Sequence, residues 1–246
     1  MSRRVPEGPP PPPAVQKLRV HYARRGRLRF SSTRDFARAL ERALRRAGVP
    51  MAFSAGFHPH PKISYAGGAP TGTASEAEYF EISVTEQVDP DAVARALDAA
   101  LPDGLDVVSV VDAQPGALAD RLEASRWRLE FAGLEPQQLE AALTAYLAED
   151  VVEVTRTFKR GPRTFDTRAA VLQTGLRDEG SRAGDPPCAI LEMVVRHTTP
   201  AVRPDDIVTA IIAVSSLSLP RTPTVTRLAQ GPWRDETGTI GDPFAD

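Results

Sequence analysis

Hydrophobic and polar positions recur with two different periods in the first half of the chain, which predicts a mixture of strands and helices. Apolar residues alternate with polar ones over residues 18–22, as in a half-buried strand that is interrupted by a turn before residue 30. Over residues 33–47 they recur every three or four positions, which predicts a helix with one buried stripe. Ser32 or Thr33 can cap this helix, and Gly48 follows its end. The other elements expected in this half are strands at 51–53, 63–65, 79–84 and 105–111 and a helix at 90–101.

The second half of the chain gives the same order of elements. We expect strands at 127–131, 151–158, 165–172, 189–195 and 219–228 and helices at 136–148 and 204–214. The two halves therefore predict an α+β protein with tandem ferredoxin-like (βαββαβ) domains and antiparallel sheets, over residues 17–115 and 116–228. Residues 1–16 are expected to be a disordered, Pro-rich tail, and residues 229–246 a flexible tail rich in Gly, Pro and Asp.

Composition excludes several classes of protein. The chain has 246 residues, of which 41% are hydrophobic and 25% charged, as in ordinary globular domains. Its single cysteine, Cys188, excludes an internal disulfide framework and a cysteine-ligated iron–sulfur cluster. No apolar run approaches the roughly 20 residues that a membrane helix needs. We therefore expect a cytoplasmic protein without a membrane partner.

Charge is strongly segregated along the chain, although the formal net charge is only −2. Residues 17–62 carry twelve Lys/Arg and two acids, a net charge of +10, whereas residues 73–123 carry twelve acids and two arginines, a net charge of −10. So basic a segment needs an anionic counterpart nearby. Either the acidic segment folds against it, or an anionic partner binds it.

The predicted helix at 33–47 carries a row of arginines beside its apolar stripe. Arg34, Arg38, Arg42 and Arg45 recur at helical spacing, and Glu41 is the only acid after Asp35. Guanidinium groups bind phosphate oxygens bidentately, so this row suits a phosphate-rich partner. The alternative is a solvated face neutralised by the acidic segment 76–112. A smaller basic group on the hairpin expected over 151–172, with a net charge of +3, either extends a nucleic-acid groove or is an ordinary solvated hairpin.

The segment 54–65 is the most unusual string, because it combines Gly56, two prolines, two histidines and Lys62. Phe57 could anchor this stiff loop or stack on a base. Three functions are conceivable: contact with a phosphate or base, metal binding through His58 and His60, and acid–base chemistry by His58. Metal binding lacks a third evident ligand, and the remaining alternative to all three functions is a purely structural loop.

Several strings together resemble the radical SAM-linked protein family, a domain of otherwise unassigned function. They are Arg25-Gly26-Arg27-Leu28-Arg29-Phe30, the segment 42–50, Ser54-Ala55-Gly56-Phe57-His58-Pro59 with residues 61–64, and the segment 72–79. The resemblance is specific over residues 17–84, looser to about 228, and covers neither tail. It implies an accessory domain for radical SAM chemistry or RNA metabolism, whose stand-alone members are encoded near a ribonuclease of the E/G type.

Two features of this chain limit what the resemblance implies. The chain lacks the three-cysteine cluster motif, so radical SAM chemistry would need a partner protein. The family often has Ser-His-x-Asp at the helix start, whereas Ser32-Thr33-Arg34-Asp35 has threonine in place of histidine. A mechanism that requires this histidine is therefore in doubt here.

We expect an RNA-binding accessory protein that contacts tRNA or rRNA, needs no cofactor and is not itself an enzyme. One alternative is a docking and substrate-guiding partner of a separate radical SAM enzyme or an E/G-type ribonuclease. Another is a metal-independent ribonuclease with His58 as its catalytic residue. The residues expected to contact nucleic acid are Arg25, Arg27, Arg29, Arg38, Arg42, Arg46, Phe57, His58, Lys62 and Ser64.

Overall fold

The computed structural model describes residues 11–177 and 186–245, which form two compact units. The first unit contains the described residues up to Arg121 together with the C-terminal segment from Pro243, and the second contains Leu122–Asp242. The boundary therefore lies after Arg121, six residues beyond the expected one, and Leu118 just before it is buried. Most of the tail expected over residues 1–16 lies outside the described residues.

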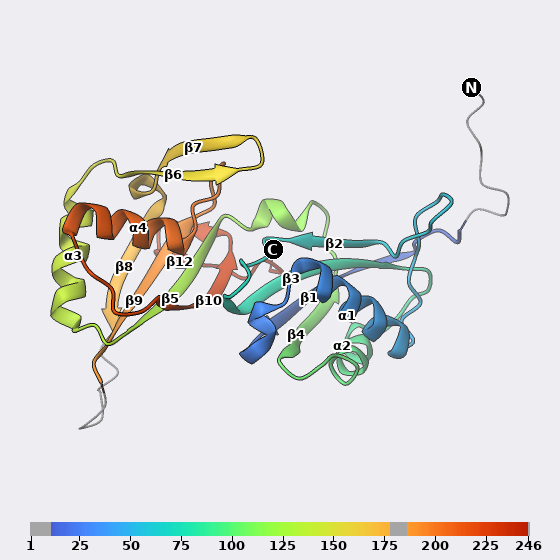
Figure 1. Ribbon diagram of the computed structural model, residues 1–246. Helices are drawn as coiled ribbons and strands as arrows, with labels where there is room; N and C mark the ends of the chain where they lie inside the picture. The colour runs from blue at the N-terminus through green and yellow to red at the C-terminus, as the bar shows by residue number, and fades with distance from the viewer. Residues whose placement is uncertain (1–10, 178–185, 246) are drawn as a thin grey trace. The chain divides into compact units, whose positions relative to one another are not determined.

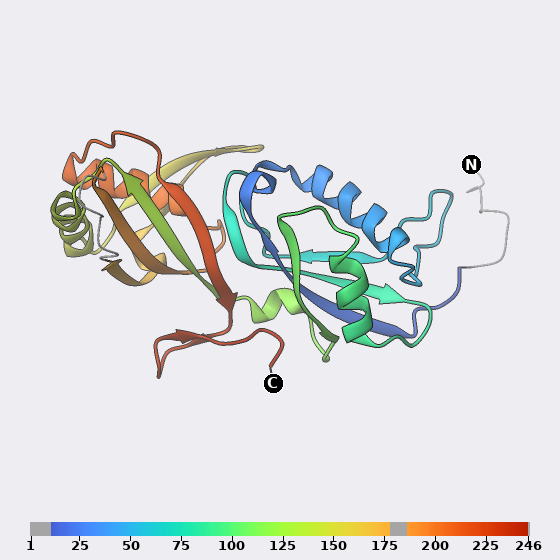
Figure 2. The same cartoon turned by 90° about the horizontal axis from the view of Figure 1, so that it is seen from below.

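The first unit is an antiparallel sheet with two helices packed on one face (Figures 1 and 2). Its strands have the order β4-β1-β3-β2, and one hydrophobic core joins three of them to both helices. The elements are β1 (Gln16–Arg24), α1 (Thr33–Arg46), β2 (Ile63–Ala66), β3 (Ala74–Val84), α2 (Pro90–Asp98) and β4 (Leu105–Asp112). Short 3-10 helices at Gly26–Phe30 and Leu118–Arg121 complete the unit.

The second unit has a four-stranded antiparallel sheet in the order β10-β5-β9-β8 and a separate two-stranded hairpin, β6–β7. Its elements are β5 (Ala124–Ala132), α3 (Pro136–Ala148), β6 (Glu153–Phe158), β7 (Gly161–Asp166), β8 (Val171–Arg177), β9 (Cys188–Arg196), α4 (Pro204–Ser215) and β10 (Thr224–Gly231). The short strands β11 (Trp233–Arg234) and β12 (Thr239–Ile240) pair with each other.

The mixed α/β class with antiparallel pairing is confirmed, and two local expectations are corrected. The expected strand at 165–172 is divided, because the Asp166 carboxylate accepts hydrogen bonds from the Arg168 and Ala169 amides and turns the chain. The expected flexible tail at 229–246 instead contains the end of β10, the β11–β12 pair and a docked Phe244. No helix within the described residues is long and apolar enough to cross a membrane.

The register between β1 and β3 places opposite charges directly across from each other. Arg19 pairs with Glu81, and its Nε donates to that carboxylate at 3.1 Å. Its Nη2 donates to the carbonyls of Gln114 and Gly116, both at 2.9 Å. Arg19 is fully buried, so these acceptors replace part of the water that its guanidinium loses, whereas Nη1 has no hydrogen-bond partner within the described residues.

The face of the first sheet that lies opposite its helices is covered by other segments of the same unit. Residues 18, 20 and 22 point into the helical core, so Arg19 and His21 lie on the opposite face. The rings of His21 and Tyr79 lie 4.7 Å apart by centroid, and Phe244 packs edge-on against Tyr79 at 5.3 Å. Arg121 holds the same C-terminal segment through the carbonyls of Pro243 and Ala245. The aromatic side chains on this face are therefore not open for stacking on a ligand.

We predict that Arg19→Met lowers the free energy of unfolding by about 3–5 kcal/mol, because it leaves the buried Glu81 carboxylate with only the partly exposed Lys17 as an ionic partner. Arg25→Met is the matched control, since Arg25 likewise pairs with carboxylates but is half exposed. Its cost should stay below about 1 kcal/mol. Urea unfolding of both variants measures the difference, and equal losses would show that burial of the Arg19 pair is not what stabilises the sheet.

Candidate nucleic-acid interface

Helix α1 has a buried apolar face and an exposed face that carries arginines. Phe36, Leu40, Ala43 and Leu44 are buried in the core of the first unit. Arg34, Arg38, Arg42 and Arg45 are exposed on the other side of the helix. The same 3.6-residue period that buries the apolar stripe therefore lines up the guanidinium groups.

A shallow hollow of about 410 Å³ lies on this arginine face. It is lined by Asp35, Arg38, Glu41, Arg42 and Arg45. The helix supplies both signs of charge here, but the three cations exceed the two carboxylates. A phosphate group seated in the hollow could accept hydrogen bonds from guanidinium groups one turn apart.

The N-terminus of α1 is capped by a reciprocal arrangement of Ser32 and Asp35. The Asp35 amide donates to Ser32 Oγ at 3.2 Å, and the hydroxyl donates to the Asp35 carboxylate at 2.7 Å. This hydrogen bond lowers the pKa of the Asp35 carboxyl, and the charges of Arg38 and Arg34 lower it further. Asp35 therefore stays ionised beside the arginine row.

Acids of the neighbouring segment do not neutralise the α1 arginines. Within residues 11–177 and 186–245, no ion pair involves an arginine of α1. Glu81 binds Lys17 and Arg19 of β1, and Glu76 binds Arg25. Of the acids in this segment, Glu76, Glu81 and Asp106 thus pair with β1 and the turn after it, and none of the ion pairs among the described residues reaches the helix.

The Gly/Pro/His loop is built as an extended hairpin that closes at residues 54 and 60. The Ser54 amide donates to the His60 carbonyl at 2.8 Å, and the His60 amide donates to Ser54 Oγ at 3.0 Å. Phe53 forms a bridge with Pro61 below this closure. The tip carries Phe57, whose side chain is 59% exposed, and His58, which is also exposed.

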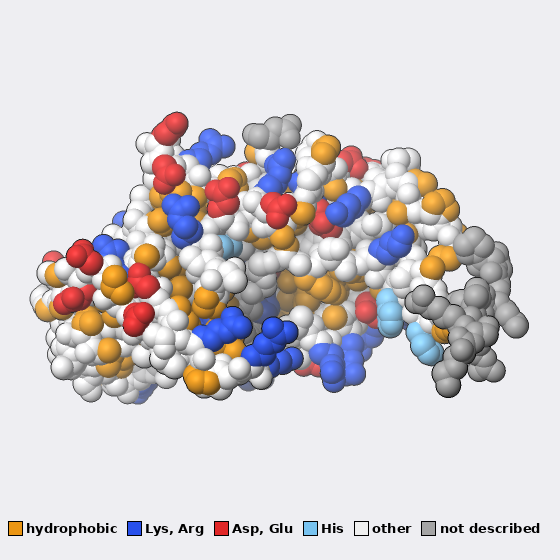
Figure 3. All heavy atoms as spheres, turned by 90° about the horizontal axis from the view of Figure 1, so that it is seen from above, with side chains coloured by type: hydrophobic (Ala, Val, Ile, Leu, Met, Phe, Trp, Pro, Cys, Tyr) orange, Lys and Arg blue, Asp and Glu red, His pale blue; other side chains and the backbone are white. Residues whose placement is uncertain are grey.

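The loop follows the C-terminal end of α1 in space as well as in sequence (Figures 1 and 2). In the space-filling view, basic side chains and histidines lie exposed on one face of the part of the molecule that carries this loop (Figure 3). Lys62 is exposed where the loop returns towards β2. The arginine face and the loop tip therefore offer cations and an aromatic ring in succession.

Three of the expected contact residues are either bound to other groups of the protein or directed away from this surface. Arg25 binds the carboxylates of Glu76 and Asp106, which raise its pKa further, so its charge is already compensated. Ser64 lies opposite Glu81 in the register, and strand alternation therefore directs it to the face away from α1. Arg46 donates to the carbonyl of Ala100, just beyond the end of α2, where it complements the negative end of that helix.

The other expected residues occupy different environments. Arg38 and Arg42 line the hollow, and Phe57, His58 and Lys62 lie on the loop. Arg27 is exposed on the 3-10 helix before α1. Arg29 is half-buried, and its guanidinium lies 4.9 Å from the Phe30 ring centroid.

Tyr65 is a site residue that sequence reasoning missed. It lies opposite Phe80 in the register and is therefore directed to the helix side of the sheet, where its ring packs 5.9 Å from that of Phe36. Burial raises the pKa of Tyr65 to about 12, and Glu41 contributes, although 43% of the side chain stays exposed. The alternating pattern over residues 63–65 predicts a strand, but it does not show which face of that strand packs beside α1.

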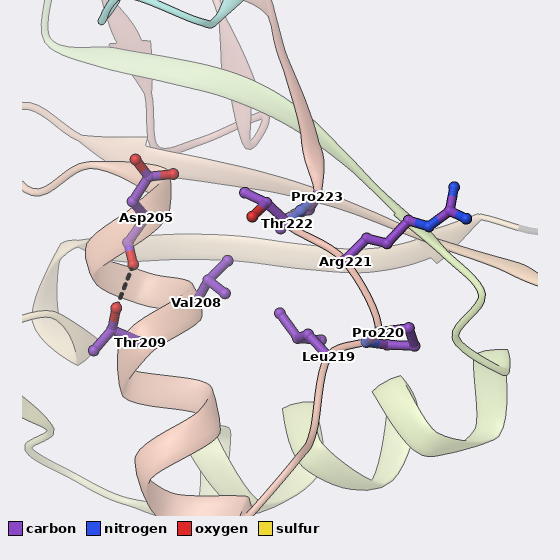
Figure 4. Close-up of a pocket in the computed structure, with 8 residues that line it drawn as sticks. All are labelled: Asp205, Val208, Thr209, Leu219, Pro220, Arg221, Thr222 and Pro223. Atoms are coloured by element: carbon purple, nitrogen blue, oxygen red, sulfur yellow. Dashed lines mark hydrogen bonds between the residues drawn. The ribbon is translucent and has the colours of Figure 1, made fainter.

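A larger hollow of about 480 Å³ lies in the second unit, between α4 and residues 219–223. Val208 and Leu219 face each other across it, whereas the Arg221 side chain extends away from Asp205 (Figure 4). Its charged groups therefore do not converge as those of α1 do. Within the described residues, no group of three or more His, Cys, Asp or Glu side chains could hold a metal ion.

Residues 17–204 match the family described as "Uncharacterized protein conserved in bacteria (DUF2344)". The chain therefore belongs to this family. No match was found among curated proteins. The family description mentions neither RNA nor a radical SAM enzyme, so both associations stay predictions.

We predict that the Asp35 carboxyl titrates below its ordinary pKa of 3.8 and that Ser32→Ala raises this pKa, because the hydroxyl donor is lost. A carboxyl with a lowered folded pKa stabilises the fold above its ordinary pKa, and the contribution is lost as the pH falls through the folded value. NMR titration of the Asp35 side chain measures both values. An unchanged pKa in the variant would contradict the capping role, and Thr33→Ala serves as the control.

Proposed function

We propose that this protein is an RNA-binding accessory factor that contacts tRNA or rRNA through the arginine face of α1 and the loop at 54–60. The observation that carries the proposal is the exposed row of Arg34, Arg38, Arg42 and Arg45, which lacks ion pairs within the described residues although an acidic segment belongs to the same unit. A polyanion such as an RNA backbone binds favourably to a row of guanidinium groups that have no ion-pair partners.

The contacts divide by chemistry. The arginines of α1 would bind phosphates, because they form a repeating set of bidentate donors. Phe57 at the loop tip and Tyr65 beside α1 would stack on unpaired bases, which are the part of RNA that side chains read most readily. His58 and Lys62 would contact a base or sugar and a phosphate respectively.

The proposal extends to the fold and the partners. The strand orders β4-β1-β3-β2 and β10-β5-β9-β8, each with two helices, support tandem ferredoxin-like domains, the second with an inserted hairpin. The C-terminal segment covers the face of the first sheet opposite its helices. This cover supports an RNA interface on the helix side, and not the stacking of bases on that sheet. As an accessory factor, the protein would present RNA to a separate enzyme, such as a radical SAM enzyme or an E/G-type ribonuclease.

We predict that binding to tRNA falls about 10³-fold between 50 and 200 mM salt, as expected for about six phosphate contacts. Arg38→Glu/Arg42→Glu should weaken binding by more than about tenfold at 100 mM salt, because it replaces two donors with repelling charges. A fluorescence-anisotropy salt series measures both effects. The control is Arg126→Glu/Arg221→Glu, which makes the same charge change at exposed positions of the second unit.

Two outcomes would contradict this prediction. Absence of tRNA and rRNA binding at 50 mM salt would remove the RNA-binding function and favour docking on a protein partner instead. Equal weakening by the control variant would show that net charge matters, not the α1 face.

We further predict that Phe57→Ala weakens binding to a single-stranded RNA about 5- to 150-fold, which corresponds to losing one stacked base. Val151→Ala, at an equally exposed apolar residue of the second unit, should have no effect. The same RNA should remain intact during incubation. RNA cleavage that disappears in His58→Ala would instead support the ribonuclease alternative.

A further inference from the structure

The β6–β7 hairpin is a separate two-stranded sheet whose two faces differ sharply. The register places Val154 opposite Phe165 and Arg156 opposite Arg163 on one face. On the other face Thr155 and Thr164 hydrogen-bond through their hydroxyls at 2.8 Å. All the charged side chains between residues 154 and 165 are basic. The hairpin is therefore a cationic ribbon from its middle to its tip.

Arg156 anchors this ribbon to the second unit. Its guanidinium lies 4.6 Å from the Phe158 ring centroid and 5.1 Å from that of Phe165. The same group binds the buried carboxylate of Asp206 on α4 and donates to the Ala201 carbonyl at 2.8 Å. Cation–π contacts and these hydrogen bonds hold the hairpin in one orientation before any partner arrives.

The remaining cations of the hairpin are left for an external anion. Lys159 and Arg160 form the turn, and Arg163 lies 5.5 Å from the Phe158 ring centroid, which restricts its side chain. All three are exposed, and none takes part in an ion pair within the described part of the chain. The nearest acid of the hairpin on β7, Asp166, is occupied by the amides of Val152, Arg168 and Ala169.

We propose that the β6–β7 hairpin is a second RNA contact, which grips the phosphate backbone through Lys159, Arg160 and Arg163. This inference rests on the proposed RNA-binding function and adds an independent site to it. The tip offers only cations, and contacts from these cations to backbone phosphates carry no sequence information, so its contribution should depend little on RNA sequence. Its preorganisation by Arg156 favours a duplex or folded RNA with closely spaced phosphates.

The test is tRNA binding by the full chain over a salt series, with three variants beside the unmodified protein. The hairpin variant is Lys159→Ala/Arg160→Ala/Arg163→Ala, the α1 variant is Arg38→Glu/Arg42→Glu, and the matched control is Arg95→Ala/Arg126→Ala/Arg221→Ala. The hairpin variant should reduce the slope of log affinity against log salt by about 2 to 3, because three phosphate contacts are lost, which makes binding about 100- to 500-fold weaker at 0.1 M salt. Urea unfolding should be unchanged, because all three side chains are exposed.

The outcomes separate this inference from the proposed function. If the unmodified protein does not bind tRNA, both are overturned. If it binds and the α1 variant loses binding, but the hairpin variant keeps the original slope, only the hairpin inference is overturned. A hairpin variant that loses binding to poly-glutamate while tRNA binding stays unchanged would overturn it in favour of an acidic protein partner. A reduced slope in the hairpin variant, absent in the control, supports it.

Discussion

The register between β1 and β3 is the constraint on which the charge distribution of the first unit depends. It sets Arg19 opposite Glu81 in a place from which water is excluded, and Glu76 lies close enough to bind Arg25. A slip of one residue would bury an unpaired carboxylate, so both the register and the pairing are strongly specified. Because these acids are engaged by β1 and its turn, the arginines of α1 stay without carboxylate partners.

This arrangement explains how a nearly neutral chain presents a row of exposed arginines that have no ion pair within the described residues. The acidic and basic segments share one unit, yet Glu81 lies on the sheet face opposite the helices, and Glu76 is bound by Arg25. Buried pairs such as Arg19–Glu81 organise the fold, whereas the α1 arginines cost little in the folded state because they remain hydrated. The surface available for a polyanion is thus a consequence of how the core is paired.

The two units use basic residues in a similar way. Each unit holds an arginine on an internal carboxylate, Arg19 in the sheet and Arg156 at the hairpin, while other basic residues of the same segment, such as Arg27 and Lys159, remain exposed. The anchoring arginines bind carboxylates of residues that are themselves buried, Glu81 and Asp206. Internal and external arginines therefore cannot be distinguished by residue type or local density, only by what lies opposite them.

The sequence by itself determined the class of the protein, the positions of the helices and the composition of the α1 face. Helical period, the Ser32 cap and Gly48 are local signals, so α1 was expected over 33–47 and is observed at Thr33–Arg46. Only the tertiary structure decided that Arg25 is neutralised, that Ser64 and Tyr65 lie on opposite faces, and that Phe244 returns to cover the first sheet. These facts depend on register and on contacts between residues far apart in the chain, which no local pattern encodes.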